Sequence, residues 1–479
     1  MKIEKVNKQE LFSSLPPVRR IADFYEKGYP LAEKMVVLDD DPTGVQTVHD
    51  VSVYTDWSVE SLKAGLLEDG HVFFVLTNSR GLSAADSKAQ HEQIVKNLAE
   101  ASRRTGVKFT ILSRSDSTLR GHYPLETATL RRGLIEEGMG DVDGEIIAPF
   151  FPEGGRFTVH DVHYVAEGDT LVPAGMTEFA RDTTFGYSAS TLTDWACEKN
   201  PELRRDEVHP ISIELLRNEG ADAVCERLMA VRNFEKVVVD SADYADMEVF
   251  VTGLYKAMAQ GKRFMFRVAA GLVRVMANIA PQSLLTGAQL ATGSKLGGLV
   301  IVGSHVKKTT MQLQQLLTLE GVSPLEFDVM QLEDAQGAEE YIKQTVAKVR
   351  ETLLCGKTAV VYTSRRVVRK TEGNSEENLK FSLGVSAALV KIVQSLDVMP
   401  AFIVAKGGIT SSDIGVKGLG AKRAWVLGQI LPGIPVWRLG EESKYPGVCY
   451  VVFPGNVGGE DALRLVVDGA QRRVEAPLV

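Results

Sequence analysis

Short apolar runs that end in polar clusters recur along the first half of the chain. Stretches between them, such as 84–101 and 212–231, space their apolar residues as amphipathic helices do. The alternation predicts an α/β fold with a mainly parallel sheet. Because ligands bind beyond the carboxyl ends of parallel strands, the polar clusters should share one cleft. The runs are residues 36–44, 72–81, 109–121, 146–150, 237–243 and 264–271.

A second series of the same kind follows, and no sequence repeat links the two. Residues 151–190 interrupt the first series with glycines and alternating positions, which predicts a hairpin excursion over the cleft. Residues 280–297 lack a period and contain Gly, Ser, Thr and Pro, so we place a domain boundary there. Strands of the second series are predicted at 299–305, 358–365, 401–408, 424–428 and 448–456, with helices at about 307–319, 334–354, 378–396 and 459–471.

The predicted architecture is therefore two α/β domains with mainly parallel sheets facing a shared interdomain cleft. An N-terminal lead-in is expected to contain a helix that opens at Pro16-Pro17 and runs toward Tyr25. The predicted divisions are a helical lead-in at 1–33, a first domain at 34–279, a linker at 280–297 and a second domain at 298–479.

Composition narrows the function classes. The 479 residues carry a net charge of −8 with scattered basic residues, which argues against nucleic acid as the main partner. The four cysteines are far apart and form no CxxC pair, so neither a zinc site nor a disulfide framework is indicated. The N-terminus lacks an apolar signal core, and no uncharged apolar run reaches about 18 residues. We expect a cytoplasmic enzyme without a membrane segment.

The candidate site residues of the first domain are charged clusters at strand ends. Three adjacent carboxylates, Asp39-Asp40-Asp41, precede a Pro-Thr-Gly turn. They repel one another, so the arrangement is costly unless a positive or hydroxylic group, such as a metal ion or a polyol, lies against them. The run Ser113–Gly121 mixes two arginines with hydroxyls around Asp116, and Arg80 follows a neighbouring strand. Arg binds a carboxylate through two parallel hydrogen bonds, so an acidic, hydroxylated small molecule is indicated. The alternatives are a capping acid and an internal Asp116–Arg120 salt bridge.

His160 and His163 stand three residues apart. On one strand their side chains would point to opposite faces, so joint metal ligation is disfavoured, although one of them could touch a substrate.

Glycine-rich turns mark the second domain. The pattern of Phe402–Gly415 predicts a buried strand, a Gly-Gly turn and the start of a helix. Such an arrangement attracts anions through free backbone N–H groups. Similar designs begin at Gly303-Ser304-His305, followed by Thr309 and Gln312, and at Pro454. A nucleotide phosphate chain would explain all three, although each alone could be a tight connection. Gly356-Lys357-Thr358 is no Walker motif, and no GxGxxG after a strand, GxSxG or HExxH is present.

Together these motifs resemble the four-carbon acid sugar kinase family over about residues 34–470. The family's Asp-Asp-x-Thr-Gly is similar to residues 40–44, its Ser-Arg turn to 79–80, its Lys-x-Asp-Ser-Thr-x-Arg-Gly to 114–121 and its Gly-Arg-Thr-Val to 155–159. Its Gly-Ser-x-x-x-x-Thr-x-x-Gln resembles 303–312, its Gly-Gly-x-Thr-Ser resembles 407–411 and its Gly-Asn-x-Gly resembles 455–458. The chain departs from the family pattern at Arg114 (usually Lys), Ile409 (often acidic), Ser412 (often Gly) and Phe453-Pro454 (often Lys-Ser).

The resemblance implies an ATP-dependent kinase that phosphorylates threonate, erythronate or a 3-oxo-tetronate type acid, with Mg²⁺, the acid bound by the N-terminal domain and the nucleotide by the C-terminal domain. The expected catalytic carboxylates are Asp40 and Asp41; the expected substrate contacts are Arg80, Arg114, Asp116, Ser117, Arg120 and His163. The expected nucleotide contacts are Ser304, Gly407, Gly408, Ile409, Thr410, Gly455 and Gly458, with no metal ligand assigned. The alternatives are a non-kinase enzyme acting on sugar acids and a non-catalytic protein that binds nucleotide or sugar acid. The sequence leaves open whether the protein forms a homo-oligomer.

Overall fold

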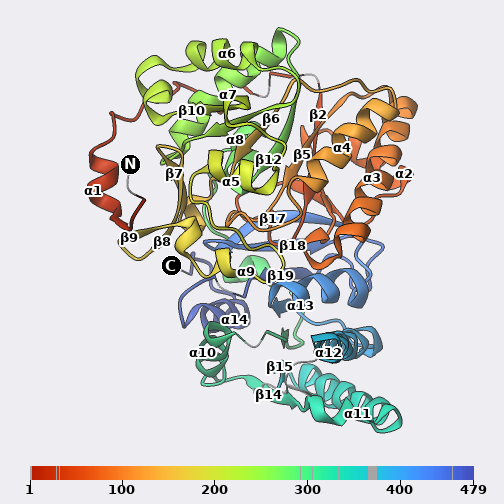
Figure 1. Cartoon of the computed structure of the whole chain (residues 1–479). Helices are drawn as coiled ribbons and strands as arrows, with labels where there is room; N and C mark the ends of the chain where they lie inside the picture. The colour runs from red at the N-terminus through yellow and green to blue at the C-terminus, as the bar shows by residue number, and fades with distance from the viewer. Residues whose placement is uncertain are drawn as a thin grey trace. The chain divides into compact units, whose positions relative to one another are not determined.

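The computed structural model describes residues 3–28, 30–31, 33–291, 293–304, 306–332, 334–364, 375–455 and 457–478. The chain divides into two compact α/β units (Figure 1). Unit 1 comprises residues 1–48 and 56–281, and unit 2 comprises residues 49–55 and 282–479. The α/β class predicted from the alternating pattern is confirmed.

Unit 1 is built on a parallel sheet. Strand β2 is buried along its whole length, as expected for a parallel strand whose two faces are covered. Every pairing along this sheet is parallel. The strand order is β10 (Val208–Ile211), β11 (Glu235–Val239), β6 (Gly144–Ala148), β12 (Phe264–Val268), β5 (Phe109–Arg114), β2 (Lys34–Asp39) and β4 (Val72–Leu76).

The helices of unit 1 begin and end where local chemistry allows. Helix α3 starts after Ser83, whose hydroxyl accepts a hydrogen bond from the Asp86 N–H, and it ends at Gly106, with φ of +74°. The helix expected at 212–231 is divided at Gly220, with φ of +89°, into a π-helical turn at Leu215–Glu219 and helix α6. The helices are α2 (Val59–Leu67), α3 (Ala84–Thr105), α4 (Leu125–Glu136), α5 (Leu192–Lys199), α6 (Ala221–Ala230), α7 (Tyr244–Ala259) and α8 (Ala270–Met276).

The excursion predicted at 151–190 contains an antiparallel hairpin, as expected. Strands β7 (Arg156–Val159), β8 (Val162–Glu167) and β9 (Thr170–Pro173) form a small sheet that the N-terminal strand β1 (Val6–Asn7) completes.

The helix predicted from Pro16 toward Tyr25 is wrong. The lead-in helix is instead α1 (Lys8–Ser13), which is capped by the Asn7 side chain. Beyond it, Asp23 adopts φ of +54°, which an α-helix cannot accommodate, and Arg19 donates a hydrogen bond to the carbonyl of Asn218.

Unit 2 is built on a mixed sheet. The strand order is β3 (Val51–Tyr54), β17 (Arg423–Leu431), β18 (Ile434–Leu439), β19 (Cys449–Phe453), β16 (Ile403–Lys406), β13 (Leu299–Val302), β15 (Thr358–Thr363) and β14 (Val322–Phe327). The pairings from β3 to β19 are antiparallel, and those from β19 to β14 are parallel. Strand β3 comes from the segment between two parts of unit 1, and the sequence pattern did not predict it.

The helices of unit 2 follow the predicted series closely. They are α9 (Gly287–Leu290), α10 (Lys307–Leu316), α11 (Ala335–Leu354), α12 (Ser375–Ser395), α13 (Gly408–Asp413) and α14 (Ala462–Arg472). Across the described parts of both units, no helix combines the length and hydropathy that crossing a bilayer requires.

Candidate functional site

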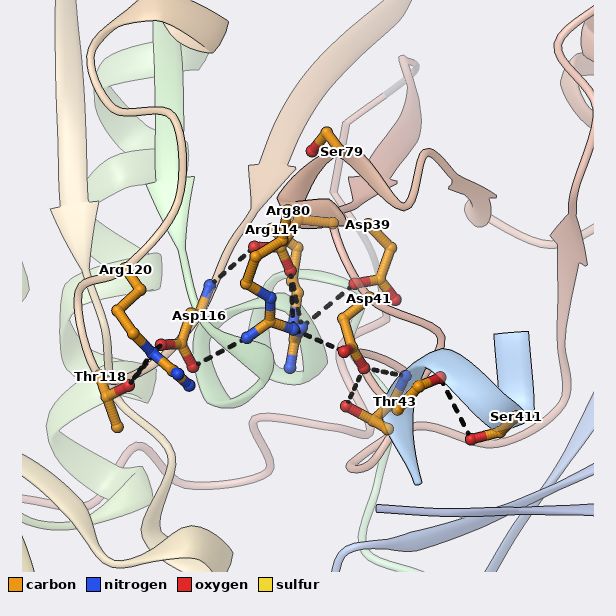
Figure 2. A network of polar contacts seen from close by, with 12 residues as sticks. Asp39, Asp41, Thr43, Ser79, Arg80, Arg114, Asp116, Thr118, Arg120 and Ser411 are labelled. Carbon is orange, nitrogen blue, oxygen red and sulfur yellow. Dashed lines mark hydrogen bonds and ion pairs between the residues drawn. The ribbon is translucent and has the colours of Figure 1, made fainter. Parts of the chain in front are cut away.

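Three neighbouring strands of unit 1 bring the predicted charged clusters together. β4, β2 and β5 lie side by side and run parallel, so their carboxyl ends share one edge of the sheet. Asp39 ends β2, and Asp40 and Asp41 follow it. Arg80 follows β4, and Arg114 ends β5, with Asp116 and Arg120 beyond it. Figure 2 shows these side chains converging in one polar network.

Two arginines lie among the three adjacent carboxylates. Arg114 Nη1 lies 3.2 Å from Asp39 Oδ1 and 3.4 Å from Asp40 Oδ1. Arg80 Nη2 lies 2.7 Å from Asp41 Oδ2 and 3.6 Å from Asp40 Oδ1. The cations that the repelling carboxylates require are therefore supplied by the protein.

The environments of the three carboxylates separate their pKa values. Burial raises the pKa of Asp39 to about 8, against the opposing charge of Arg114. Burial also raises the pKa of Asp40, to about 6, with Arg80 and Arg114 opposing it. Asp41 is buried as well, but Arg80 and the hydrogen bonds from Thr43 outweigh burial and lower its pKa. Near neutral pH, Asp39 is mostly protonated, whereas Asp40 and Asp41 are ionised.

Asp116 links the aspartates to the third predicted arginine. Its carboxylate lies 3.3 Å from Arg80 Nη1 and accepts a 2.7 Å hydrogen bond from Arg120 Nε. Burial alone would favour the neutral acid, but the two guanidinium groups hold the pKa of Asp116 well below its usual range. The backbone N–H of Asp116 donates to Asp40 Oδ2 at 3.2 Å, so the two predicted clusters form one network.

The predicted substrate contacts Ser117 and His163 lie beside this network but are buried. His163 Nε2 is 2.8 Å from the carbonyl oxygen of Ser117, and Nδ1 is 3.0 Å from Thr158 Oγ1. Burial lowers the pKa of His163 to about 4, so the ring is neutral. Both ring nitrogens thus have protein partners. His163 can therefore hold the Ser117 backbone in position. His160 Nε2 instead lies 2.9 Å from Glu214 Oε1.

Gly44 lies directly against the first carboxylate. A Cβ at this position would lie 2.0 Å from both carboxylate oxygens of Asp39. The Gly44 N–H donates to the carbonyl of Asp41 at 3.0 Å, which closes the turn that holds the aspartates. Only glycine allows this close approach.

Gly44→Ala is therefore expected to displace the Asp39 carboxylate from Arg114 and to lower the free energy of unfolding by about 1–3 kcal/mol, as overpacking does. Urea unfolding measures the effect. Gly81→Ala is the matched control, since its added Cβ would meet nothing within 4 Å. Equal stability of the two variants would contradict the close approach.

Two further arginines belong to this region, and neither was predicted as a site residue. Arg267, on β12, has no exposed surface to speak of (1%), donates from Nη2 to the carbonyl of Arg120 at 3.0 Å and lies 5.2 Å from the Trp195 ring. Arg156 lies over the Phe179 ring. Arg267 could have been found from the sequence, because an arginine within an apolar strand is unusual unless it has a polar partner.

In unit 2, the three glycine-rich turns follow the neighbouring parallel strands β13, β16 and β19. A Cβ on Gly303 would lie 2.3 Å from Thr410 Oγ1, and one on Gly407 would lie 2.9 Å from Ser304 Cβ. Thr309 Oγ1 lies 3.2 Å from Ser304 Oγ and donates to the carbonyl of Gly455 at 3.3 Å. The three turns are therefore in close contact with one another.

The remaining predicted nucleotide contacts lie on the same turns. Gly408 begins α13, Ile409 follows it with 73% of its side chain exposed, and Gly458, with φ of +82°, lies in the turn after β19. Gln312 fixes this last turn by donating from Nε2 to the carbonyls of Val457 and Gly459. His305 and Asn456 lie outside the described residues.

No group of three or more His, Cys, Asp or Glu side chains within the described ranges is arranged to hold a metal ion. A Mg²⁺ ion that accompanies a nucleotide needs only one or two carboxylates besides phosphate oxygens and water. A site without three such protein ligands is therefore compatible with this ion.

Two family descriptions match the two halves of the chain. Residues 35–276 match "Sugar-binding N-terminal domain", and residues 299–463 match "Nucleotide-binding C-terminal domain". No curated protein sequence matches the chain significantly.

Solved structures share the fold. A Salmonella typhimurium LT2 protein, provisionally named a tRNA synthase, is 17% identical with a TM-score of 0.68, covering 92% of this chain and 100% of its own. The Haemophilus influenzae protein HI1011, of the family DUF1537, is 20% identical with a TM-score of 0.63, covering 91% of this chain and 99% of its own. At these identities the likeness shows the fold alone. The two matched domains carry the assignment: the chain belongs to the four-carbon acid sugar kinase family.

Proposed function

We propose that this protein transfers the γ-phosphoryl group of ATP, with Mg²⁺, to a hydroxyl of a four-carbon sugar acid of the threonate, erythronate or 3-oxo-tetronate type. The pairing of a sugar-binding domain with a nucleotide-binding domain supports a kinase. The observation that carries the proposal is the network at the carboxyl ends of β4, β2 and β5, where an ionised carboxylate of raised pKa lies among guanidinium groups.

Asp40 is our candidate for the carboxylate that orients the attacking hydroxyl and accepts its proton. A general base works best when its pKa lies near the working pH, and the pKa of Asp40 is raised to about 6. Asp41 is the weaker base because Arg80 and the hydrogen bonds from Thr43 lower its pKa. We assign Asp41 to holding Arg80 in place.

Arg80, Arg114 and Arg120 are proposed to bind the acid group of the substrate, with Asp116 orienting Arg80 and Arg120. Each already contacts a carboxylate of the protein, but a guanidinium group has five N–H donors. Arg114 Nε has no hydrogen-bond partner among the described residues, so donors remain for a ligand. Ser117 and His163 would form the buried side of the same binding site.

In unit 2 we propose that Ser304, Gly407–Thr410, Gly455 and Gly458 bind the nucleotide phosphates. MgATP supplies the phosphoryl group and neutralises charge on it, so the protein's task is to position the two reactants and exclude water.

A coupled assay of ADP release tests the function. The purified chain, MgATP and a panel of four-carbon sugar acids and their 3-oxo forms should give ADP release that depends on at least one acid. Acid-dependent turnover of the panel without ATP consumption would identify a non-kinase enzyme instead. Nucleotide binding without turnover on any member would identify a non-catalytic protein. Either result would contradict the proposal.

A further inference from the structure

Lys406, the last residue of β16, is a lysine with no exposed surface. Its Nζ donates hydrogen bonds to the carbonyls of Pro454 and, at 3.2 Å, Gly455, and it lies 4.1 Å from the centre of the Phe453 ring. Register pairs Lys406 with Phe453 across the neighbouring strands. The amino group is therefore held beneath the turn that follows β19.

The protein supplies no acidic partner for this amino group among the described residues. Lys406 forms no ion pair there, and the charged group that acts on its pKa is another lysine, Lys308. Burial and the charge of Lys308 together lower the pKa of Lys406 to about 7. A buried ammonium without a counter-ion is costly, so an anion bound nearby would stabilise its charged form.

Four carbonyls of the turn that follows β19, those of Pro454, Gly455, Val457 and Gly459, accept hydrogen bonds from the protein. Besides Lys406, Thr309 donates to the carbonyl of Gly455, and Gln312 donates to those of Val457 and Gly459. In a trans peptide group the C=O and N–H point in opposite directions, so fixing the Pro454 carbonyl on Lys406 turns the Gly455 N–H away from it. A backbone N–H group oriented in this way can donate to an anion, which would lie on the other side of the turn from the lysine.

We propose that Lys406 is a proton-coupled positioning residue: it takes up a proton from solvent when a nucleotide phosphate binds at the Gly455 turn, and its charge stabilises that anion through the turn. This inference rests on the proposed function, because the anion is taken to be a nucleotide. The lysine does not touch the phosphate. It holds the turn in either protonation state, and its charged form gains population when an anion is present.

Proton uptake is the readout, since a purely structural tether would show none. Calorimetric titration with ADP at about pH 7.5, in two buffers of different ionisation enthalpy, should give uptake of most of one proton per ADP bound, because a lysine of pKa about 7 is mainly neutral there. The Kd for ADP should rise by close to tenfold between about pH 7.5 and 8.5, a range in which ADP itself is almost fully ionised.

Lys406→Met should remove both the proton uptake and the pH dependence. Lys343→Met, which alters an exposed lysine of α11, should keep both. Two results would overturn the inference and leave the kinase proposal standing. One is binding of ADP to the wild-type protein without proton uptake, and the other is pH dependence of the Kd that persists in Lys406→Met. If neither ADP nor ATP binds, the proposed function fails and the inference with it. Should Lys406→Met not fold, the wild-type proton count decides alone.

Discussion

Replacing Arg80 by Met is expected to abolish turnover and to lower the free energy of unfolding by about 3–5 kcal/mol, the range for removing one partner of a buried ion pair. The Arg80 guanidinium lies 2.7 Å from Asp41, 3.3 Å from Asp116 and 3.6 Å from Asp40. Without it, three neighbouring carboxylates would face one another with much less compensating charge. Their pKa values would rise, and the network would lose its geometry.

Turnover and urea unfolding measure the two effects. Arg80→Lys keeps one charge but cannot reach three carboxylates at once, so it should recover part of the stability and little of the turnover. Arg132→Met is the matched control, because Arg132 pairs with the half-exposed Glu92 on the surface of the same unit. Its removal should cost no more than about 1 kcal/mol. An Arg80→Met protein as stable as Arg132→Met would show that the network does not depend on Arg80.

Replacing Asp40 by Asn is expected to lower kcat by about a hundredfold or more while ADP binding is retained, since the change removes the proposed proton acceptor and nothing in unit 2. Asp39→Asn provides a matched control. The pKa of Asp39 is raised to about 8, so Asn imitates a group that is already mostly neutral at neutral pH, and turnover should stay near the wild-type value.

The pH profile separates the two residues further. A base must be unprotonated, and Asp40 gains its proton as pH falls through about 6. The wild-type kcat/KM for the acid should therefore fall about tenfold per pH unit below that point, and Asp39→Asn should follow the same profile. A larger loss from Asp39→Asn than from Asp40→Asn would exchange the assigned roles.

The sequence was sufficient to predict the clusters and to name the Asp116–Arg120 pair as an alternative, but it did not predict the contacts of Arg80 and Arg114. Apolar runs identify buried parallel strands, and parallel strands place their carboxyl ends together, so convergence of Asp40, Arg80 and Arg114 follows from pattern alone. That Arg80 contacts three carboxylates depends on side-chain rotamers and the local path of each loop, which no periodicity encodes. The raised pKa of Asp40 depends in turn on burial, which is a tertiary property.

Residues that the sequence analysis missed share a cause. Lys406 ends a short apolar strand, where a lysine is usually solvated, but Phe453 and the turn after β19 cover its amino group. Strand β3 has four residues, and it is a strand because β17 pairs with it. In each case the deciding partner is distant along the chain, so a local pattern could not reveal it.

The origin of β3 has a consequence for biosynthesis. Its Ser52 accepts a hydrogen bond from Arg423, 371 positions later, so this edge of the unit 2 sheet cannot close until most of the polypeptide has left the ribosome. During that interval the edge of β3 that β17 pairs with stays open, and a nascent chain truncated before β17 would expose this edge to chaperones or to aggregation.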